Sequence, residues 1–93
     1  MLRKDQKILY QKITETISII MQNKDFKWSG VEISKATKIR QSRISELKNY
    51  DRYNKIVNKK DLKRLIHKGI FDFNLLVANL EQHEIVFLKK AIK

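Results

Sequence analysis

The stretch from Ser29 to Asn49 constrains this chain most, because its spacing predicts two short helices joined by a tight turn. Ser29 and Glu32 have the spacing of a capping box, in which each side chain accepts a hydrogen bond from the backbone N–H of the other residue. Trp28 before the cap and Ile33 after it form the matching hydrophobic staple. The first helix of the pair is therefore expected to be capped by Ser29.

The second helix of the pair has an apolar side and a polar side. The turn falls at residues 37–40, after which Ile44 and Leu47 mark the buried side. At about 100° per residue, the polar side chains gather opposite this apolar pair. Small hydrogen-bonding groups on an exposed helix face suit the base edges of a DNA groove. We therefore predict that bases are read by Gln41, Ser42, Ser45, Glu46 and Asn49.

Positive charge is concentrated around this stretch. The chain has a net charge of +11, and residues 24–68 hold fourteen basic and five acidic side chains, against three of each in residues 69–93. A run of charge is most often a solvated surface, but its coincidence with a polar helix face favours nucleic acid. Cations beside such a face suit DNA phosphates, and the predicted side-chain contacts are Lys38, Arg40, Arg43, Lys48, Arg52, Lys55 and Lys60.

The segment EISKATKIRQSRISELKN resembles the Cro and lambda-repressor-like helix-turn-helix proteins. The resemblance is specific over residues 29–49 and weaker from there to about residue 70. It consists of a small residue in the first helix, a hydrophobic residue in the turn, and Gln-Ser followed by a buried Ile and Leu in the second helix. The structural positions are filled here by Ser34, Ile39, Ile44 and Leu47.

This chain departs from that family at two positions. Lys38 stands where the turn usually carries Gly, and Arg40 stands where the second helix usually opens on Ser or Thr. A non-glycine residue at positive φ costs free energy, and Arg is a poor N-cap. The resemblance also implies that a DNA phosphate meets the backbone N–H groups near Gly30 and Val31, which agrees with the positive end of the helix dipole.

Amphipathic patterns predict further helices on both sides of this pair. Residues 49–57 predict a polar and aromatic connection that follows the DNA backbone, in which at least one tyrosine packs inward and no two-stranded wing forms. Asn58 then caps a helix that Gly69 closes. Residues 5–22 predict a first helix, whose buried stripe is expected to contain Leu9, Ile13, Ile17 and Ile20, widened by Ile8, Ile19 and Met21.

The C-terminal segment, residues 72–92, contains more apolar residues than the inward faces of its helices require. Asp72 is placed to cap a short helix through about Leu80, and a further helix begins at residue 82 or 83. The surplus indicates either a helix buried all round or an interface with a second copy. Because a helix-turn-helix normally reads two half-sites as a symmetric dimer, we favour the interface. The predicted dimer contacts are Phe73, Leu76, Leu80 and Phe87.

The composition argues against several other classes of protein. The chain has no Cys, and no metal-ligand spacing accompanies its two histidines, so no metal and no cofactor are expected. Neither His67 nor His83 has an obvious orienting carboxylate and nucleophile beside it, which argues against an enzyme. No apolar run approaches eighteen residues, and MLRKDQK is unlike a signal peptide, so a cytoplasmic protein without membrane contact is expected.

Together these patterns predict a single all-α domain over residues 1–93, a five- or six-helix bundle with a lambda-repressor-like helix-turn-helix at about 29–49. The predicted function is sequence-specific binding of double-stranded DNA by a homodimeric transcriptional regulator. The resemblance implies a repressor of the Cro-like phage or plasmid type that acts by occupying an operator. The alternative is a DNA-binding antitoxin of a toxin–antitoxin pair, whose apolar C-terminal segment binds a small protein partner.

Overall fold

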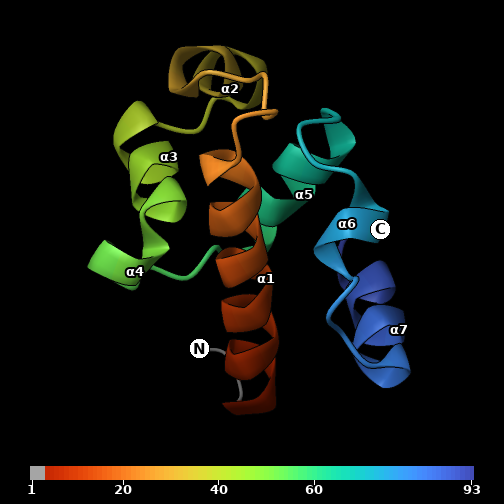
Figure 1. The fold of residues 1–93 in the computed structure, drawn as a ribbon. Helices are drawn as coiled ribbons and strands as arrows, with labels where there is room; N and C mark the ends of the chain where they lie inside the picture. The colour runs from red at the N-terminus through yellow and green to blue at the C-terminus, as the bar shows by residue number, and fades with distance from the viewer. Residues whose placement is uncertain (1–3) are drawn as a thin grey trace.

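The computed structural model describes residues 4–93, with side chains from residue 6 onward, and the first three residues of the predicted domain lie outside the described residues. Every regular element in this range is a helix, which confirms the all-α fold class. The helices are α1 (Lys4–Gln22), α2 (Gly30–Thr37), α3 (Gln41–Lys48), α4 (Tyr50–Tyr53), α5 (Lys59–His67), α6 (Phe73–Leu76) and α7 (Gln82–Ala91). Figure 1 shows α1 in the middle, with α3 and α4 on one side, α6 and α7 on the other, and α2 across its C-terminal end.

Helix α1 supplies the centre of the hydrophobic core. Leu9, Ile13 and Ile17 are buried as their spacing predicts. The expected widening of the stripe by Ile8 and Ile19 is wrong, because these side chains are 46% and 69% exposed. Eleven residues separate the two, so they share one face of α1, and that face is rotated by more than 100° away from Ile13. The buried side of α1 therefore lies away from the face that Ile8 and Ile19 share, and it extends to Tyr10, Thr14 and Ser18.

The described chain forms seven helices rather than five or six, because α4 lies within residues predicted to be a connection. This helix is a single turn that ends at Tyr53, and the C-cap residue Asn54 has a left-handed φ of 53°. The N–H of Asn54 donates to the carbonyl of Tyr50 at 2.7 Å, which closes the turn. Tyr50 is half-buried, so one tyrosine does pack inward, whereas Tyr53 is exposed.

Helix α6 is shorter than predicted. Asp72 caps it as expected, with Oδ1 accepting the N–H of Asn74 at 2.9 Å. The helix ends at Leu76 instead of near Leu80. Val77 is buried and Leu80 packs against the core, and the N–H of Leu80 donates to the carbonyl of Val77 at 3.0 Å. The chain therefore turns here to keep both side chains on the core before α7 begins.

A buried hydroxyl joins α1 to the segment that leads into α5. Thr14 is fully buried, and its Oγ1 donates to the carbonyl of Tyr10 at 2.7 Å and accepts the N–H of Val57 at 2.9 Å. Asn58 then caps α5 as predicted, with Oδ1 accepting the N–H of Asp61 at 2.7 Å. These bonds fix where α5 starts relative to α1, and α5 carries many of the basic side chains.

Candidate nucleic-acid interface

The capping box at the start of α2 is present. Ser29 Oγ accepts the N–H of Glu32 at 3.1 Å, and Glu32 Oε1 accepts the N–H of Ser29 at 3.0 Å. Ile33 is fully buried, and Trp28 is half-buried against the core, as a hydrophobic staple requires. Gly30, the first residue of α2, and Val31 after it are exposed. The N-terminal end of α2 is therefore held in place while its first residues face solvent.

The connection between α2 and α3 contains the conformational cost that the sequence predicts. Lys38 has φ 63° and ψ 19°, and its N–H donates to the carbonyl of Ser34 at 2.7 Å. Ser34 Oγ in turn donates to the carbonyl of Ile39 at 2.6 Å, and the Ile39 side chain is buried. The Lys38 side chain forms no hydrogen bond or ion pair within residues 6–93. Arg40 likewise precedes α3 without capping it.

Helix α3 is anchored at its buried side and at its C-terminal end. Ile44 and Leu47 are buried as predicted. The carbonyl of Lys48 accepts two hydrogen bonds from α1, one from Ser18 Oγ at 2.6 Å and one from Gln22 Nε2 at 2.8 Å. Sequence reasoning missed this clamp, because nothing local connects α1 to a carbonyl twenty-six or more residues away. The clamp fixes the rotation of α3, and therefore which side chains face outward.

The outward face of α3 is polar, and the five predicted base-reading residues differ in how free they are. Gln41, Ser42 and Ser45 are exposed, and Glu46 is half-buried. Glu46 forms no ion pair with a residue of the described chain, so its carboxylate is not neutralised within α3. Asn49 caps the end of α3 and donates its Nδ2 to the carbonyl of Ser45 at 3.0 Å. The first two turns of α3 therefore carry its freest hydrogen-bonding groups.

A hollow of about 460 Å³ lies between the start of α2 and this face of α3. It is lined by Ser29, Gly30, Val31, Gln41, Ser45 and Lys48 together with the apolar side chains of Met21, Phe26, Trp28 and Ile44. A Cβ added at Gly30 would meet only the Cγ2 of Ile44, at 4.0 Å. The protein itself therefore leaves the space in front of the α2 N-terminus open. The exposed backbone N–H groups at the start of α2 and the Lys48 side chain can both face an anion in this hollow.

A second hollow, of about 260 Å³, lies on the other side of the α2–α3 connection, and we call it the basic hollow. Arg43 and Arg64 are half-buried there, and Asp61 is the one carboxylate among the lining residues. Arg64 was not among the predicted phosphate contacts, although its spacing of four residues from Lys60 places both on one side of α5. The lining residues are Lys38, Ile39, Arg40, Arg43, Asn58, Lys60, Asp61 and Arg64.

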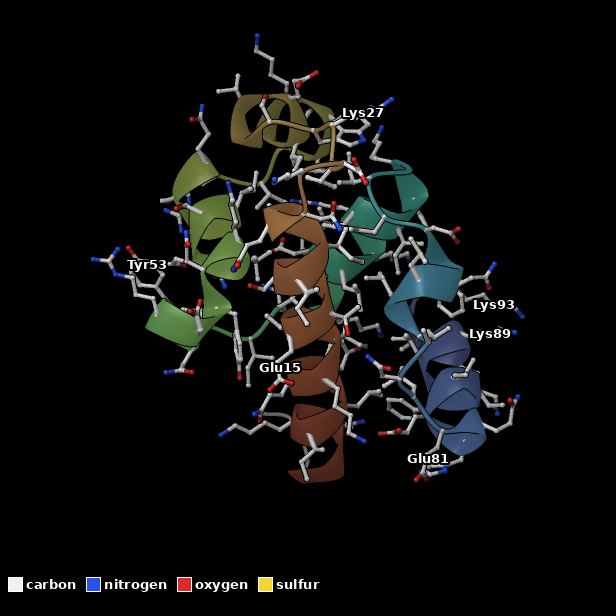
Figure 2. The ribbon with its side chains drawn as sticks, viewed as in Figure 1. Glu15, Lys27, Tyr53, Glu81, Lys89 and Lys93 are labelled. Carbon is white, nitrogen blue, oxygen red and sulfur yellow. The ribbon has the colours of Figure 1, made fainter. Side chains whose placement is uncertain are left out.

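The remaining predicted phosphate contacts, Arg52 and Lys55, lie apart from both hollows. Both side chains are exposed. The Arg52 guanidinium lies 5.7 Å from the ring centre of Tyr53, which Figure 2 shows on the outer end of α4. Burial, and then the charge of Glu15, raise the pKa of the Tyr50 hydroxyl. The structure therefore places seven of the nine predicted phosphate contacts around α3 and these two beyond its C-terminal end.

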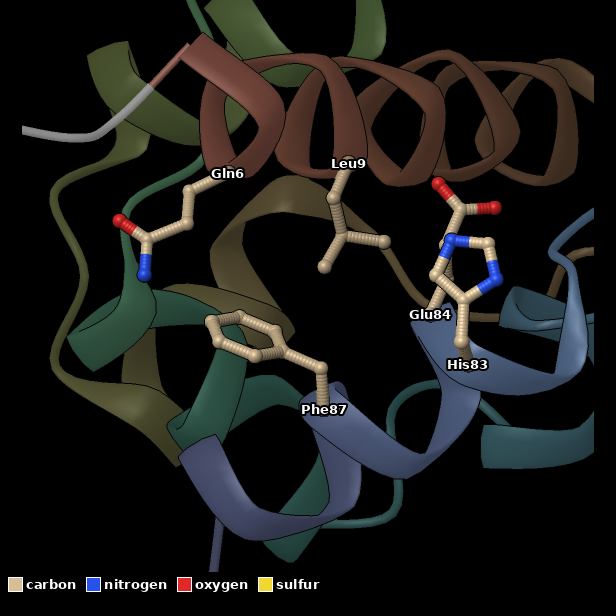
Figure 3. Close-up of a pocket in the computed structure, with 5 residues that line it drawn as sticks. All are labelled: Gln6, Leu9, His83, Glu84 and Phe87. Carbon is tan, nitrogen blue, oxygen red and sulfur yellow. The ribbon is translucent and has the colours of Figure 1, made fainter.

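The four predicted dimer contacts do not share one exposed surface. Leu76 is fully buried within the monomer, so its assignment to a dimer interface is wrong. Phe73 and Leu80 are half-buried against the same core. Phe87 is 39% exposed, and Figure 3 shows its ring extending from α7 toward α1 across a hollow of about 230 Å³. Spacing alone could not distinguish these positions, because each carries an apolar side chain on a short helix or turn.

Both short contacts between an acidic and a basic side chain among the described residues involve α7, and the one at His83 is an ion pair only when its imidazole is protonated. Lys12 Nζ lies 3.2 Å from Glu84 Oε2, which joins α1 to α7, and His83 Nδ1 lies 3.4 Å from Glu81 Oε2. A hydrogen bond from the backbone N–H of Glu81, and then the Lys12 ammonium, lower the pKa of the Glu84 carboxyl. Within residues 6–93, the cations around α3 therefore have no ion-pair partner.

Comparisons of this chain with protein-family models, curated proteins and solved structures found no match. Among residues 4–93, no helix combines the length and apolar character needed to cross a bilayer. Within the same residues, no three histidine or carboxylate side chains gather as a metal-binding group. The proposal for function therefore rests on the geometry of α2, α3 and α5.

Proposed function

We propose that this protein is a sequence-specific, double-stranded DNA-binding transcriptional regulator in which α2 and α3 act as a lambda-repressor-like helix-turn-helix. One observation supports this proposal: the exposed polar face of α3 lies between two hollows. One of these hollows is lined by five cations that have no ion-pair partner among the described side chains. A helix of this kind fits a major groove, whose base edges offer hydrogen-bonding groups and whose two walls are phosphate strands.

In this proposal the N-terminal half of α3 reads the bases. The amide of Gln41 can bond adenine N6 and N7 together, and the Glu46 carboxylate can accept a hydrogen bond from cytosine N4. Glu46 lowers affinity for phosphate-rich DNA in general unless it finds such a donor, so its value lies in discrimination. The hydrogen bonds from Ser18 and Gln22 to the α3 C-terminus support the proposal, because base readout needs a helix that cannot rotate.

We also propose that the protein binds its site as a homodimer and represses transcription by occupying an operator. Two exposed apolar side chains on α7, Val86 and Phe87, support an interface there. Phe87→Asp is expected to dissociate the dimer and to weaken operator binding, because one half-site contributes far less than two. Light scattering at tens of micromolar, with and without operator, measures this. A wild-type protein that is monomeric in both conditions would refute the dimer.

Selection of duplexes from a random pool, followed by binding measurements on the selected duplex and a scrambled one, tests base readout. Gln41→Ala should weaken binding to the selected duplex by about 1–3 kcal/mol and barely change binding to the scrambled one. Glu46→Ala should relax base preference while leaving or raising affinity for scrambled DNA. Lys60→Ala, the matched control for a phosphate contact, should weaken both by similar factors. If Gln41→Ala loses the same factor on both duplexes, α3 is not the reading helix.

One observation favours the second candidate, a DNA-binding antitoxin. Leu75 of α6 is 56% exposed and borders a hollow of about 410 Å³ that Phe26 and Phe71 also line. This hollow, which α6 borders, could receive a partner protein. Co-expression with the product of a neighbouring gene, followed by size-exclusion chromatography, tests this candidate. A stoichiometric complex that Leu75→Ser disrupts would support it, and separate elution would contradict it.

A further inference from the structure

We propose that the basic hollow is a discrete binding site for two linked phosphate groups, rather than part of a diffuse positive surface. Two sources can supply this chemistry, consecutive phosphates of a DNA strand or a free polyphosphate. The first source rests on the proposed function, and the second does not. The experiment below separates them.

The charge in the hollow is the first argument. Five cations from three separate segments, the α2–α3 connection, α3 and α5, line one space of about 260 Å³, and Asp61 is the one carboxylate beside them. None of the five forms an ion pair with a described acidic residue. Gathering like charges costs free energy because the charges repel one another. An anion bound in the hollow would be attracted to all five cations, and this attraction would offset their repulsion. The unmatched charge gives the hollow the electrostatic attraction that an anion-binding site needs.

The rigidity of the hollow is the second argument. Lys38 is held at positive φ by the hydrogen bonds of Ser34, so the start of its side chain cannot drift with a flexible loop. Arg43 and Arg64 are half-buried on helices whose other sides are packed in the core. Arginine guanidinium groups present several N–H donors in a fixed plane, which suits phosphate oxygens. The two half-buried arginines therefore lose less side-chain freedom than fully exposed ones would when an anion binds.

Asp61 gives the hollow a feature that a diffuse surface would lack. Its side chain is 9% exposed, and its Oδ2 accepts a hydrogen bond from Asn58 Nδ2 at 3.3 Å. A carboxylate at this position repels a bound phosphate, so neutralising it should strengthen binding specifically here. The five cations and Asp61 give the hollow a net charge of +4 (five minus one), which is more than the charge of about −2 on one phosphate group, so the charge favours two linked phosphates.

Inorganic pyrophosphate is the probe for the site, titrated into the wild-type protein and variants at low salt by calorimetry. Lys60→Gln and Arg64→Gln should each weaken pyrophosphate about three- to tenfold, the range expected for one charge-assisted hydrogen bond at a partly exposed site. Lys63→Gln is the matched control, because it removes the same charge from the same helix and Lys63 does not line the hollow. Asp61→Asn should strengthen binding about three- to tenfold by the same reasoning. Thermal melts establish that each variant is folded.

The outcomes separate this inference from the proposed function. A 1:1 stoichiometry with the expected order of variants, together with displacement of pyrophosphate by duplex DNA, assigns the hollow to the DNA backbone. If pyrophosphate binds in this way but no duplex binds, the proposed function fails and the hollow takes a free polyphosphate. If Lys63→Gln weakens pyrophosphate as much as Arg64→Gln, while DNA binding still depends on Gln41, the discrete site is refuted and the proposed function stands.

Discussion

Replacing Lys38 with glycine should make the protein more stable and a poorer DNA binder. Lys38 adopts φ 63°, where a non-glycine residue costs about 1–2 kcal/mol, and glycine gives back part of this through its larger unfolded-state entropy. The net gain expected for Lys38→Gly is therefore about 1 kcal/mol. For a domain of this size, such a gain raises Tm by roughly 4–8 °C. The lysine side chain has no partner within residues 6–93 whose loss would offset the gain.

Thermal melts and DNA-binding isotherms over a range of salt concentrations measure the two halves of this prediction. If Lys38 contacts a phosphate, Lys38→Gly should weaken all duplexes similarly and reduce the magnitude of the slope of log K against log[salt] by about one for each subunit, or about two for the dimer. Asn54→Gly is the matched control, because Asn54 also has positive φ, 53°, but carries no charge. It should stabilise the fold less, since Asn tolerates this conformation better than Lys, and leave the salt slope unchanged.

Two results would refute the reasoning about Lys38. A destabilised Lys38→Gly would mean that the lysine makes favourable contacts that outweigh its backbone conformation. A stabilised variant with unchanged DNA affinity and salt slope would mean that the cation at this position has no phosphate to meet.

Three further predictions concern salt, pH and the buried hydroxyl. If each subunit neutralises three or four phosphates, the salt slope of the wild-type dimer should be about −5 to −7, and a slope near zero would contradict electrostatic binding. Because the pKa of Glu84 is lowered on folding, its contribution is complete above its unfolded pKa of about 4.3 and is lost as pH falls through the folded value. Glu84→Gln should therefore lower stability at pH 7 by less than about 1 kcal/mol, with equal stabilities near pH 2 in urea titrations. Thr14→Val leaves the buried N–H of Val57 without an acceptor and should cost about 1–3 kcal/mol in the same titrations, whereas a neutral result would mean that water replaces the hydroxyl.

Sequence was sufficient wherever the controlling interactions are local. The capping box of Ser29 and Glu32, the N-cap at Asn58 and the left-handed Lys38 all depend on residues within one helical turn, and all are present. The buried stripe of α1 and the apolar pair of α3 follow from helix periodicity, which is also a short-range property. The polar face of α3, and with it most of the candidate site, could therefore be predicted.

Sequence was insufficient where a segment has more apolar residues than its helices can bury, because the local pattern does not show which of them are buried. Leu76 and Phe87 look equivalent in the chain, yet one is fully buried and the other is 39% exposed. Ile19 is an aliphatic residue of the kind found in protein cores, yet it is 69% exposed. The difference depends on which helix covers which face, and that depends on how α6 and α7 turn back along α1.

The sequence by itself therefore determined an all-helical chain, its helix starts, a polar and basic α2–α3 segment and the turn that joins its two helices. Only the tertiary structure decided that Arg64 joins Lys38 and Arg43 around one hollow, and that α1 clamps the end of α3 through Ser18 and Gln22. The physical reason is the distance along the chain over which each interaction acts. Backbone caps and periodicity act over a few residues, whereas a convergent site needs side chains far apart in the chain to be brought together by the packing of the whole core.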